Sequence, residues 1–142
     1  MLRPAPGTYV LILFSSHQGS IPVGHLGQLS VERGYYLYVG SARGRGGLKA
    51  RIAHHQKVTS RPHWHIDYLR AVTRIDRVWC AYTRVNQEHR WARLIGKLPG
   101  AQMSIAGFGS SDCRCGSHLY FFKMRPARET FKLLSASLAH PH

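Results

Sequence analysis

The sequence predicts a small α+β domain with a central, mostly antiparallel sheet flanked by helices. Three observations lead to this fold class. The chain has 142 residues, which is the length of one domain. Short apolar runs typical of strands come first, and segments with helical periodicity are interleaved later. No internal repeat divides the chain. We therefore expect one domain over residues 1–125 and a C-terminal tail with a short helix over residues 126–142.

Three strands are expected in the N-terminal part. Thr8–Phe14 is a β-branched and aliphatic run with little polarity, which is typical of a buried strand. Ile21–Leu26 is a weaker strand, and Tyr35–Val39 gives the clearest strand signal in the chain. Because turn residues separate these runs, we expect the three strands to be antiparallel and linked as hairpins.

Helical periodicity begins after the glycine-rich, basic segment Gly40–Gly47, where Leu48 and Ile52 share one face with His55. A helix of this kind offers backbone N–H groups to a phosphate at its start. The later expected elements are a helix over 63–72 with Pro62 in its first turn, a strand over 75–82, a helix from its N-cap Asn86 to Leu98, a strand over 118–124 and a short helix around 131–138.

The charge balance points to a polyanionic partner. Twenty Lys and Arg residues stand against six Asp and Glu residues, which gives a formal net charge of +14. Nucleic acid is therefore the first partner to expect. No apolar run approaches the length of a membrane span, and no cleavable signal is visible, so we expect no membrane association.

The basic residues are concentrated between positions 33 and 61, where one acidic residue, Glu32, lies beside them. We expect this segment to dock on a phosphate backbone without reading base sequence. The side chains that we assign to nucleic-acid binding are Arg43, Arg45, Lys49, Lys57 and Arg61.

The three cysteines, Cys80, Cys113 and Cys115, cannot form a disulfide framework, so a reducing cytoplasm is expected. Asp112, Cys113, Cys115 and His118 also raise the alternative of a zinc site. The Cys-x-Cys spacing is not that of common zinc ribbons or fingers, and no second cysteine pair accompanies it. We therefore favour a structural turn for this segment.

Two short strings each place a tyrosine beside a glycine at a strand end. They are Gly7-Thr8-Tyr9 and Tyr38-Val39-Gly40-Ser41-Ala42, and the helix after the second string supplies Arg51 and, four residues later, His55. With these features the sequence resembles the GIY-YIG nuclease superfamily. In detail it is similar to a branch of bacterial and archaeal GIY-YIG-like domains, some fused to endonuclease III-type glycosylases. The marks of that branch are HWHIDYL at 63–69 and FGSSDCRCGSHL at 108–119.

The resemblance implies hydrolysis of phosphodiester bonds in DNA. It assigns catalytic roles to Tyr9, Tyr38, Arg51 and His55, in which the guanidinium stabilises charge on the phosphate and the other side chains position or activate water. It also implies that a glutamate at the start of the third helix binds Mg²⁺ or Mn²⁺. Glu88 lies on the apolar stripe of that helix and matches. The alternative is a carboxylate that only complements the helix dipole.

The sequence departs from the commoner pattern of this superfamily in three places. Twenty-eight residues separate Tyr9 from Tyr38, so an extra strand must be inserted, and Thr8 replaces the usual isoleucine. The late polar residue of the superfamily, commonly Asn, has no clear counterpart here, and Ser111 and Asp112 are the candidates for its position.

Several other residues are candidates for the cleft. These are Gly40, Ser41, His65, Ser111 and Asp112. Trp64 with Tyr68 forms an aromatic pair that is more typical of a core than of a base-stacking platform. His63 and Asp67 share a face and are expected to hydrogen-bond to each other.

The leading function predicted is therefore a divalent-metal-dependent DNA endonuclease in DNA repair or in the processing of structured DNA, with a DNA-repair glycosylase as a candidate partner. The alternative is a non-catalytic nucleic-acid-binding module that keeps the fold and the charge.

Overall fold

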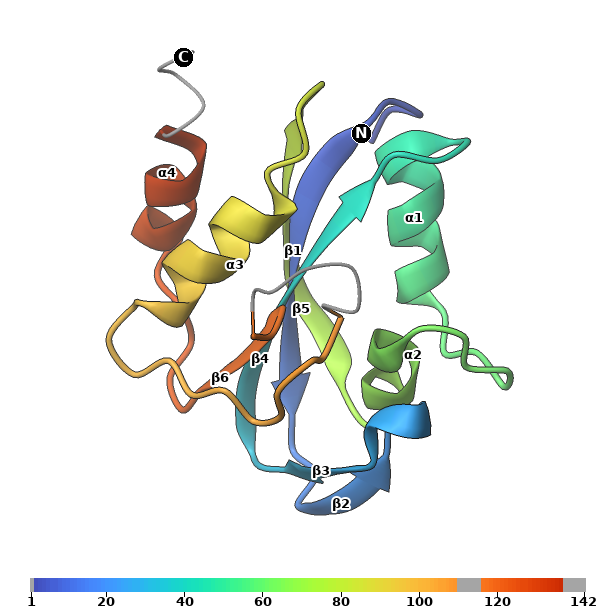
Figure 1. Ribbon diagram of the computed structural model, residues 1–142, viewed down its shortest axis with the longest axis vertical. Coiled ribbons are helices and arrows are strands. Elements are labelled where there is room, and N and C mark those ends of the chain that lie inside the picture. The colour runs from blue at the N-terminus through green and yellow to red at the C-terminus, as the bar shows by residue number, and fades with distance from the viewer. Residues whose placement is uncertain (1, 110–115, 137–142) are drawn as a thin grey trace.

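The computed structural model describes residues 2–109 and 116–136 of the chain. Its centre is an antiparallel four-stranded sheet with the order β5-β1-β4-β6 (Figure 1). Strand β1 (Gly7–Ser15) pairs along its length with β4 (Gly34–Ala42) on one side and with β5 (Arg74–Tyr82) on the other. Strand β6 (Leu119–Phe122) pairs with β4 and completes the sheet. The small α+β fold expected from the sequence is thereby confirmed.

Helices cover both faces of this sheet. Helices α1 (Gly47–Gln56) and α2 (His65–Arg70) lie on one face, and α3 (Glu88–Gly96) and α4 (Arg128–Ala136) lie on the other (Figure 1). Alternate residues of β1 therefore enter two separate cores. Because both faces of the strand are buried, the central residues of β1, from Tyr9 to Phe14, show no polar alternation.

The expected strand at Ile21–Leu26 is wrong in its extent and in its partner. Strand β2 (Gly19–Pro22) ends at a proline, and a 3₁₀ turn, η1 (Gly24–Leu26), follows it. Strand β2 pairs with β3 (Gln28–Val31) in a separate two-stranded sheet, and β1 pairs with β4 instead. The expectation that three consecutive strands form one antiparallel sheet through hairpins is therefore wrong. This small sheet is the insertion that lengthens the chain between Tyr9 and Tyr38.

The second helix begins later than expected. Trp64 has an extended backbone, and α2 starts at His65, so Pro62 lies outside the first turn. The cause is Asp67, whose Oδ2 accepts hydrogen bonds from the backbone N–H groups of His63 and Trp64, both at 2.9 Å. These bonds hold the two residues outside the helix.

Three other boundaries shift by a few residues. The N-cap of α3 is Gln87 rather than Asn86, although the Asn86 side chain accepts a hydrogen bond from the Glu88 backbone N–H at 2.8 Å. The helix ends at Gly96 and β6 spans four residues. The helix expected near the C-terminus is present as α4. Its Phe131 and Leu134 pack against the core that contains Trp79 and Trp91.

None of the helices in the described part of the chain has the length and apolar character that a membrane crossing requires.

Candidate active site

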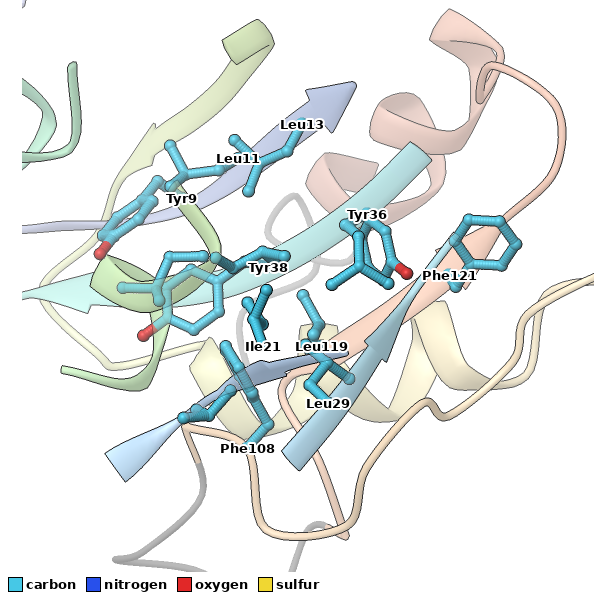
Figure 2. Close-up of a cluster of buried hydrophobic side chains, with 14 of the residues drawn as sticks. Tyr9, Leu11, Leu13, Ile21, Leu29, Tyr36, Tyr38, Phe108, Leu119 and Phe121 are labelled. Carbon is cyan, nitrogen blue, oxygen red and sulfur yellow. The ribbon is translucent and has the colours of Figure 1, made fainter. Parts of the chain in front are cut away.

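The register of β1 and β4 brings the two tyrosines of the sequence strings onto one face of the sheet. Tyr9 pairs with Gly40, and Tyr38 pairs with Leu11 two positions along the ladder. The two rings are 6.5 Å apart between centroids. Their hydroxyl groups lie at the same end of the buried cluster that this face forms (Figure 2). The sheet therefore presents two phenols to a single region of the molecule.

The glycine opposite Tyr9 is required by the position of the tyrosine ring. A Cβ atom at Gly40 would lie 2.4 Å from Cζ and from the hydroxyl oxygen of Tyr9. Gly109 plays a similar part for the second tyrosine, because it has φ +67° and a Cβ there would lie 3.0 Å from the Tyr38 ring. Both tyrosine rings therefore pack directly against the backbone of a glycine.

Tyr9 forms a buried hydrogen-bonded pair with His55 of α1. The Tyr9 hydroxyl and Nε2 of His55 are 2.7 Å apart, and both side chains are about 1% exposed. Burial lowers the pKa of His55 to about 3, with further lowering by His54, whereas burial raises the pKa of Tyr9 well above its usual value. Both groups are therefore neutral at physiological pH, and neither pKa favours proton transfer from the phenol to the imidazole.

Arg51 lies one helical turn before His55. Its Nη1 donates a hydrogen bond to the carbonyl oxygen of Ser41 at 3.1 Å, and its guanidinium carbon lies 4.5 Å from the centroid of the Trp64 ring. These two contacts fix the direction of the guanidinium group. Burial raises the pKa of Tyr38, and the Arg51 charge only partly offsets this effect.

Glu88 reaches the same region from α3, on the other side of the sheet. One carboxylate oxygen lies 3.2 Å from Nδ1 of His118, and the side chain is 19% exposed. Burial raises the pKa of Glu88, but the interactions with His118, Asn86 and His89 together outweigh burial, so the net pKa is lowered. The carboxylate is therefore ionised. The sequence offered His118 a chemical role only in the zinc alternative, and no spacing rule links it to Glu88.

These side chains surround an open cleft with a volume of about 430 Å³. Its lining residues are Tyr38, Ser41, Arg43, Gly44, Arg51, His63, Trp64, His65, Asn86, Glu88 and Gly109. Tyr9 and His55 are absent from this lining and lie beneath it, in the core. Tyr38, Arg51 and Glu88 are thus brought together at the cleft, with the Tyr9–His55 pair buried next to them.

The other cleft candidates divide into three groups. Ser41 and His65 line the cleft, and Nδ1 of His65 accepts a hydrogen bond from the Gly109 backbone N–H at 3.0 Å. Gly40 does not line the cleft and instead lies against the Tyr9 ring. Ser111 and Asp112 lie outside the described residues, as do Cys113 and Cys115 of the zinc alternative. Sequence reasoning did not place Asn86 or Trp64 at the cleft. The Asn86 position, two residues before Glu88, was the available signal.

The basic residues assigned to nucleic-acid binding are exposed, but only Arg43 lines the cleft. Its guanidinium donates hydrogen bonds to the carbonyl oxygens of Thr83 and Arg84. Arg45 and Lys49 lie at the start of α1, whereas Lys57 and Arg61 follow the end of that helix. The structure therefore distributes these charges along α1 rather than in the cleft.

The expected hydrogen bond between His63 and Asp67 is made by the His63 backbone, not by its ring. The side-chain partner of Asp67 is His54, whose Nε2 lies 3.0 Å from Oδ1. These bonds outweigh burial and hold the pKa of the Asp67 carboxyl below its usual value.

Comparison with known proteins gives one family. Neither a curated protein nor a solved structure matches the chain significantly. The family described as "Domain of unknown function DUF123" matches residues 8–139, which include Tyr9, Tyr38, Arg51 and Glu88. The match extends over nearly the whole chain, and the protein belongs to this DUF123 family.

Proposed function

We propose that this protein is a divalent-metal-dependent DNA endonuclease of the GIY-YIG type. The observation that carries the proposal is the cleft, where a tyrosine hydroxyl, a fixed guanidinium and an ionised carboxylate meet on a chain of net charge +14. The three groups come from β4, α1 and α3, so the fold rather than local sequence assembles them.

Arg51 is the group that binds the scissile phosphate in this proposal. Its contacts with Ser41 and Trp64 orient the guanidinium before substrate arrives, so little entropy is lost on binding. A guanidinium can donate two parallel hydrogen bonds to phosphate oxygens, and it stabilises the negative charge that grows on them in the transition state.

Tyr38 faces the cleft and positions the attacking water. The neutral Tyr9–His55 pair lies behind it and supports the arrangement from the core. Because burial raises the pKa of both tyrosines, neither is a tyrosinate in the free protein. Their hydroxyl groups therefore act as hydrogen-bonding groups until phosphate and metal change the local charge.

Glu88 fits the requirements of a single Mg²⁺ ligand. Its carboxylate is ionised, partly exposed and borders the cleft, and Mg²⁺ commonly uses one or two carboxylates while retaining several waters. A bound Mg²⁺ would stabilise negative charge on the phosphate and on the leaving oxygen. His118 orients the carboxylate from the buried side.

Cleavage assays with purified protein test this proposal. Nicked, branched and abasic duplexes are incubated with Mg²⁺ or Mn²⁺, and parallel reactions contain EDTA. We expect cleavage that EDTA abolishes. We also expect Arg51→Ala and Glu88→Ala each to lower the cleavage rate by at least about a hundredfold, because each removes a group that stabilises charge in the transition state. Salt-dependent DNA binding should remain.

Two variants serve as matched controls. Arg93→Ala removes an exposed arginine from α3, and Glu129→Ala removes an exposed carboxylate from α4. Both should cleave at the wild-type rate. Cleavage by Arg51→Ala or Glu88→Ala at the rate of these controls would reject the assignment.

A non-catalytic nucleic-acid-binding module is the second candidate. It is favoured by one observation, namely that the Glu88 carboxylate already has His118 as a partner within 3.2 Å. If the wild-type protein binds DNA and cleaves none of the substrates with either metal, the binding-module hypothesis replaces the nuclease hypothesis. The proposal of DNA repair, with a glycosylase as partner, depends on the nuclease activity.

A further inference from the structure

A second group of metal-binding side chains lies next to Trp64, apart from Glu88. His54 and His55 are consecutive residues near the end of α1, and Asp67 belongs to α2. One ligand atom from each of the three lies within 4.8 Å of the ligand atoms of the other two. The shortest of these separations, between Nε2 of His54 and Oδ1 of Asp67, is 3.0 Å.

His55 has a ring nitrogen available for a ligand. Its side chain is 1% exposed, and its Nδ1 has no hydrogen-bond partner among the described residues. The other nitrogen, Nε2, is engaged with the Tyr9 hydroxyl. When Nε2 carries the ring hydrogen and donates a hydrogen bond to the Tyr9 hydroxyl oxygen, Nδ1 presents a lone pair. Metal-binding histidines are commonly oriented by such a hydrogen bond from their second nitrogen.

Asp67 is oriented in a comparable way. Its side chain is 3% exposed, and Oδ2 accepts the backbone hydrogen bonds of His63 and Trp64. Oδ1 is left for His54 or for an ion that His54 and Asp67 share. Two of the three side chains are therefore held in place before any ion binds, which lowers the entropic cost of binding.

His54 supplies the route of entry. It is 38% exposed, so an ion can arrive from solvent and this ring can rotate toward it. Ligand atoms around a tetrahedral zinc ion are roughly 3.4 Å apart, given metal–ligand bonds of about 2.1 Å. The 3.0 Å pair is already near this value. The remaining separations are at most 4.8 Å, so the bound state requires small adjustments of the His55 and Asp67 side chains as well as of His54.

We propose that His54, His55 and Asp67 bind one transition-metal ion of the Zn²⁺ class, at a site separate from Glu88. Two imidazoles and one carboxylate are ligands that zinc accepts, whereas Mg²⁺ prefers oxygen ligands and water. The nearby guanidinium groups of Arg51 and Arg70 repel every divalent cation, so the preference for zinc comes from the ligand set and not from the local charge. This proposal goes beyond the nuclease function and stands without it.

Metal titrations of full-length protein, prepared without a histidine tag and stripped of metal, test the site. We expect one equivalent of Zn²⁺ to bind, as measured by isothermal titration calorimetry, and to raise the melting temperature. Co²⁺ should bind competitively and give a visible spectrum without a thiolate-to-cobalt charge-transfer band. His54→Gln should weaken Zn²⁺ binding by at least about tenfold, because it removes the exposed ligand. Asp67→Asn should weaken it as well.

Three control variants separate this site from the alternatives. His25→Gln removes an exposed histidine of η1, and Glu88→Gln removes the carboxylate of the cleft; both should bind Zn²⁺ like wild type. The double variant Cys113→Ser/Cys115→Ser should also bind normally. The proposal is overturned if wild type binds no Zn²⁺, if His54→Gln binds as tightly as wild type, or if a thiolate band appears and is lost in the cysteine variant. Far-ultraviolet circular dichroism confirms that each variant is folded.

Discussion

Gly40 has no side chain, and this absence allows the Tyr9 ring to take the position that supports the cleft. The Tyr9 ring crosses the β4 backbone at a distance that leaves no space for a Cβ atom. The Gly40 backbone does not have a positive φ, so this glycine is required by contact rather than by conformation. The position of the Tyr9 hydroxyl, and with it the hydrogen bond to His55, therefore depends on residue 40.

A substitution at this position should disturb both stability and activity. We expect Gly40→Ala to push the Tyr9 ring away from β4 and to lower the free energy of unfolding by about 1–3 kcal/mol, the usual cost of overpacking. Cleavage should fall with it, because the tyrosine supports the cleft. Urea denaturation and the cleavage assay measure the two effects.

Gly44→Ala is the matched control, since Gly44 lines the cleft and a Cβ atom there meets nothing within 4 Å. Equal stability of the two alanine variants would contradict the steric argument.

Single residues also show what sequence reasoning can and cannot find. Arg51 and His55 are four positions apart on one helix, so their shared face follows from helical geometry. Glu88 lies near the cleft because the apolar residues of α3 turn its face toward the sheet. The contact of Glu88 with His118 joins residues thirty positions apart, and no local rule predicts it. The His54–Asp67 contact was missed because the sequence suggested His63 as the partner of Asp67.

At the scale of secondary structure, apolar runs and hydrophobic periodicity correctly predicted the strands and the helix whose side chains are deeply buried. Strands β1 and β4 were found in this way because burial makes their apolar runs strong. Helix α1 was found from the spacing of Leu48, Ile52 and His55, which are all buried. The β2–β3 hairpin was missed as a unit, because each of its strands has four residues and only one face of each contacts the core. The start of α2 was missed because the Asp67 side chain competes for backbone groups that a helix would otherwise use.

Helix α4 provides a prediction at this scale, because two adjacent leucines differ sharply in burial. Leu134 is 2% exposed and packs with the core around Trp79 and Trp91, whereas Leu133 is 64% exposed. We expect Leu134→Ala to lower the free energy of unfolding by about 2–5 kcal/mol through a core cavity. Leu133→Ala should change it by less than about 0.5 kcal/mol, as is usual on a surface.

Chemical denaturation monitored by tryptophan fluorescence measures both values. Similar, small effects of the two substitutions would show that α4 is not part of the cooperative unit.

At the scale of the whole molecule, both faces of the sheet contribute side chains to the proposed active site. The α1–α2 face carries Arg51, the Tyr9–His55 pair and the His54–Asp67 group, and the α3–α4 face contributes Glu88 from the first residue of α3 (Figure 1). A net charge of +14 acts over the entire surface, so charge alone does not specify which face would bind DNA in the proposed function. The exposed cations along α1, near the cleft, favour that face.

The dependence of DNA affinity on salt concentration distinguishes a directed binding face from diffuse attraction. Each lysine or arginine that neutralises a duplex phosphate contributes about 0.9 to the slope of log affinity against log salt concentration. We therefore expect the triple variant Arg45→Ala/Lys49→Ala/Lys57→Ala to reduce the slope by about 0.9 for each side chain that contacts phosphate. Fluorescence anisotropy with a labelled duplex, repeated over a series of salt concentrations, measures it.

The control removes the same amount of charge from the other side of the sheet. Lys97, Lys123 and Lys132 are exposed residues that follow α3, follow β6 and belong to α4, respectively. Because Lys97→Ala/Lys123→Ala/Lys132→Ala lowers the net charge equally, a purely diffuse attraction would weaken DNA binding to the same extent in both triple variants. A slope that changes only in the α1 variant requires direct phosphate contacts along α1. That result would place the DNA backbone beside Arg51, where the proposed cleavage takes place.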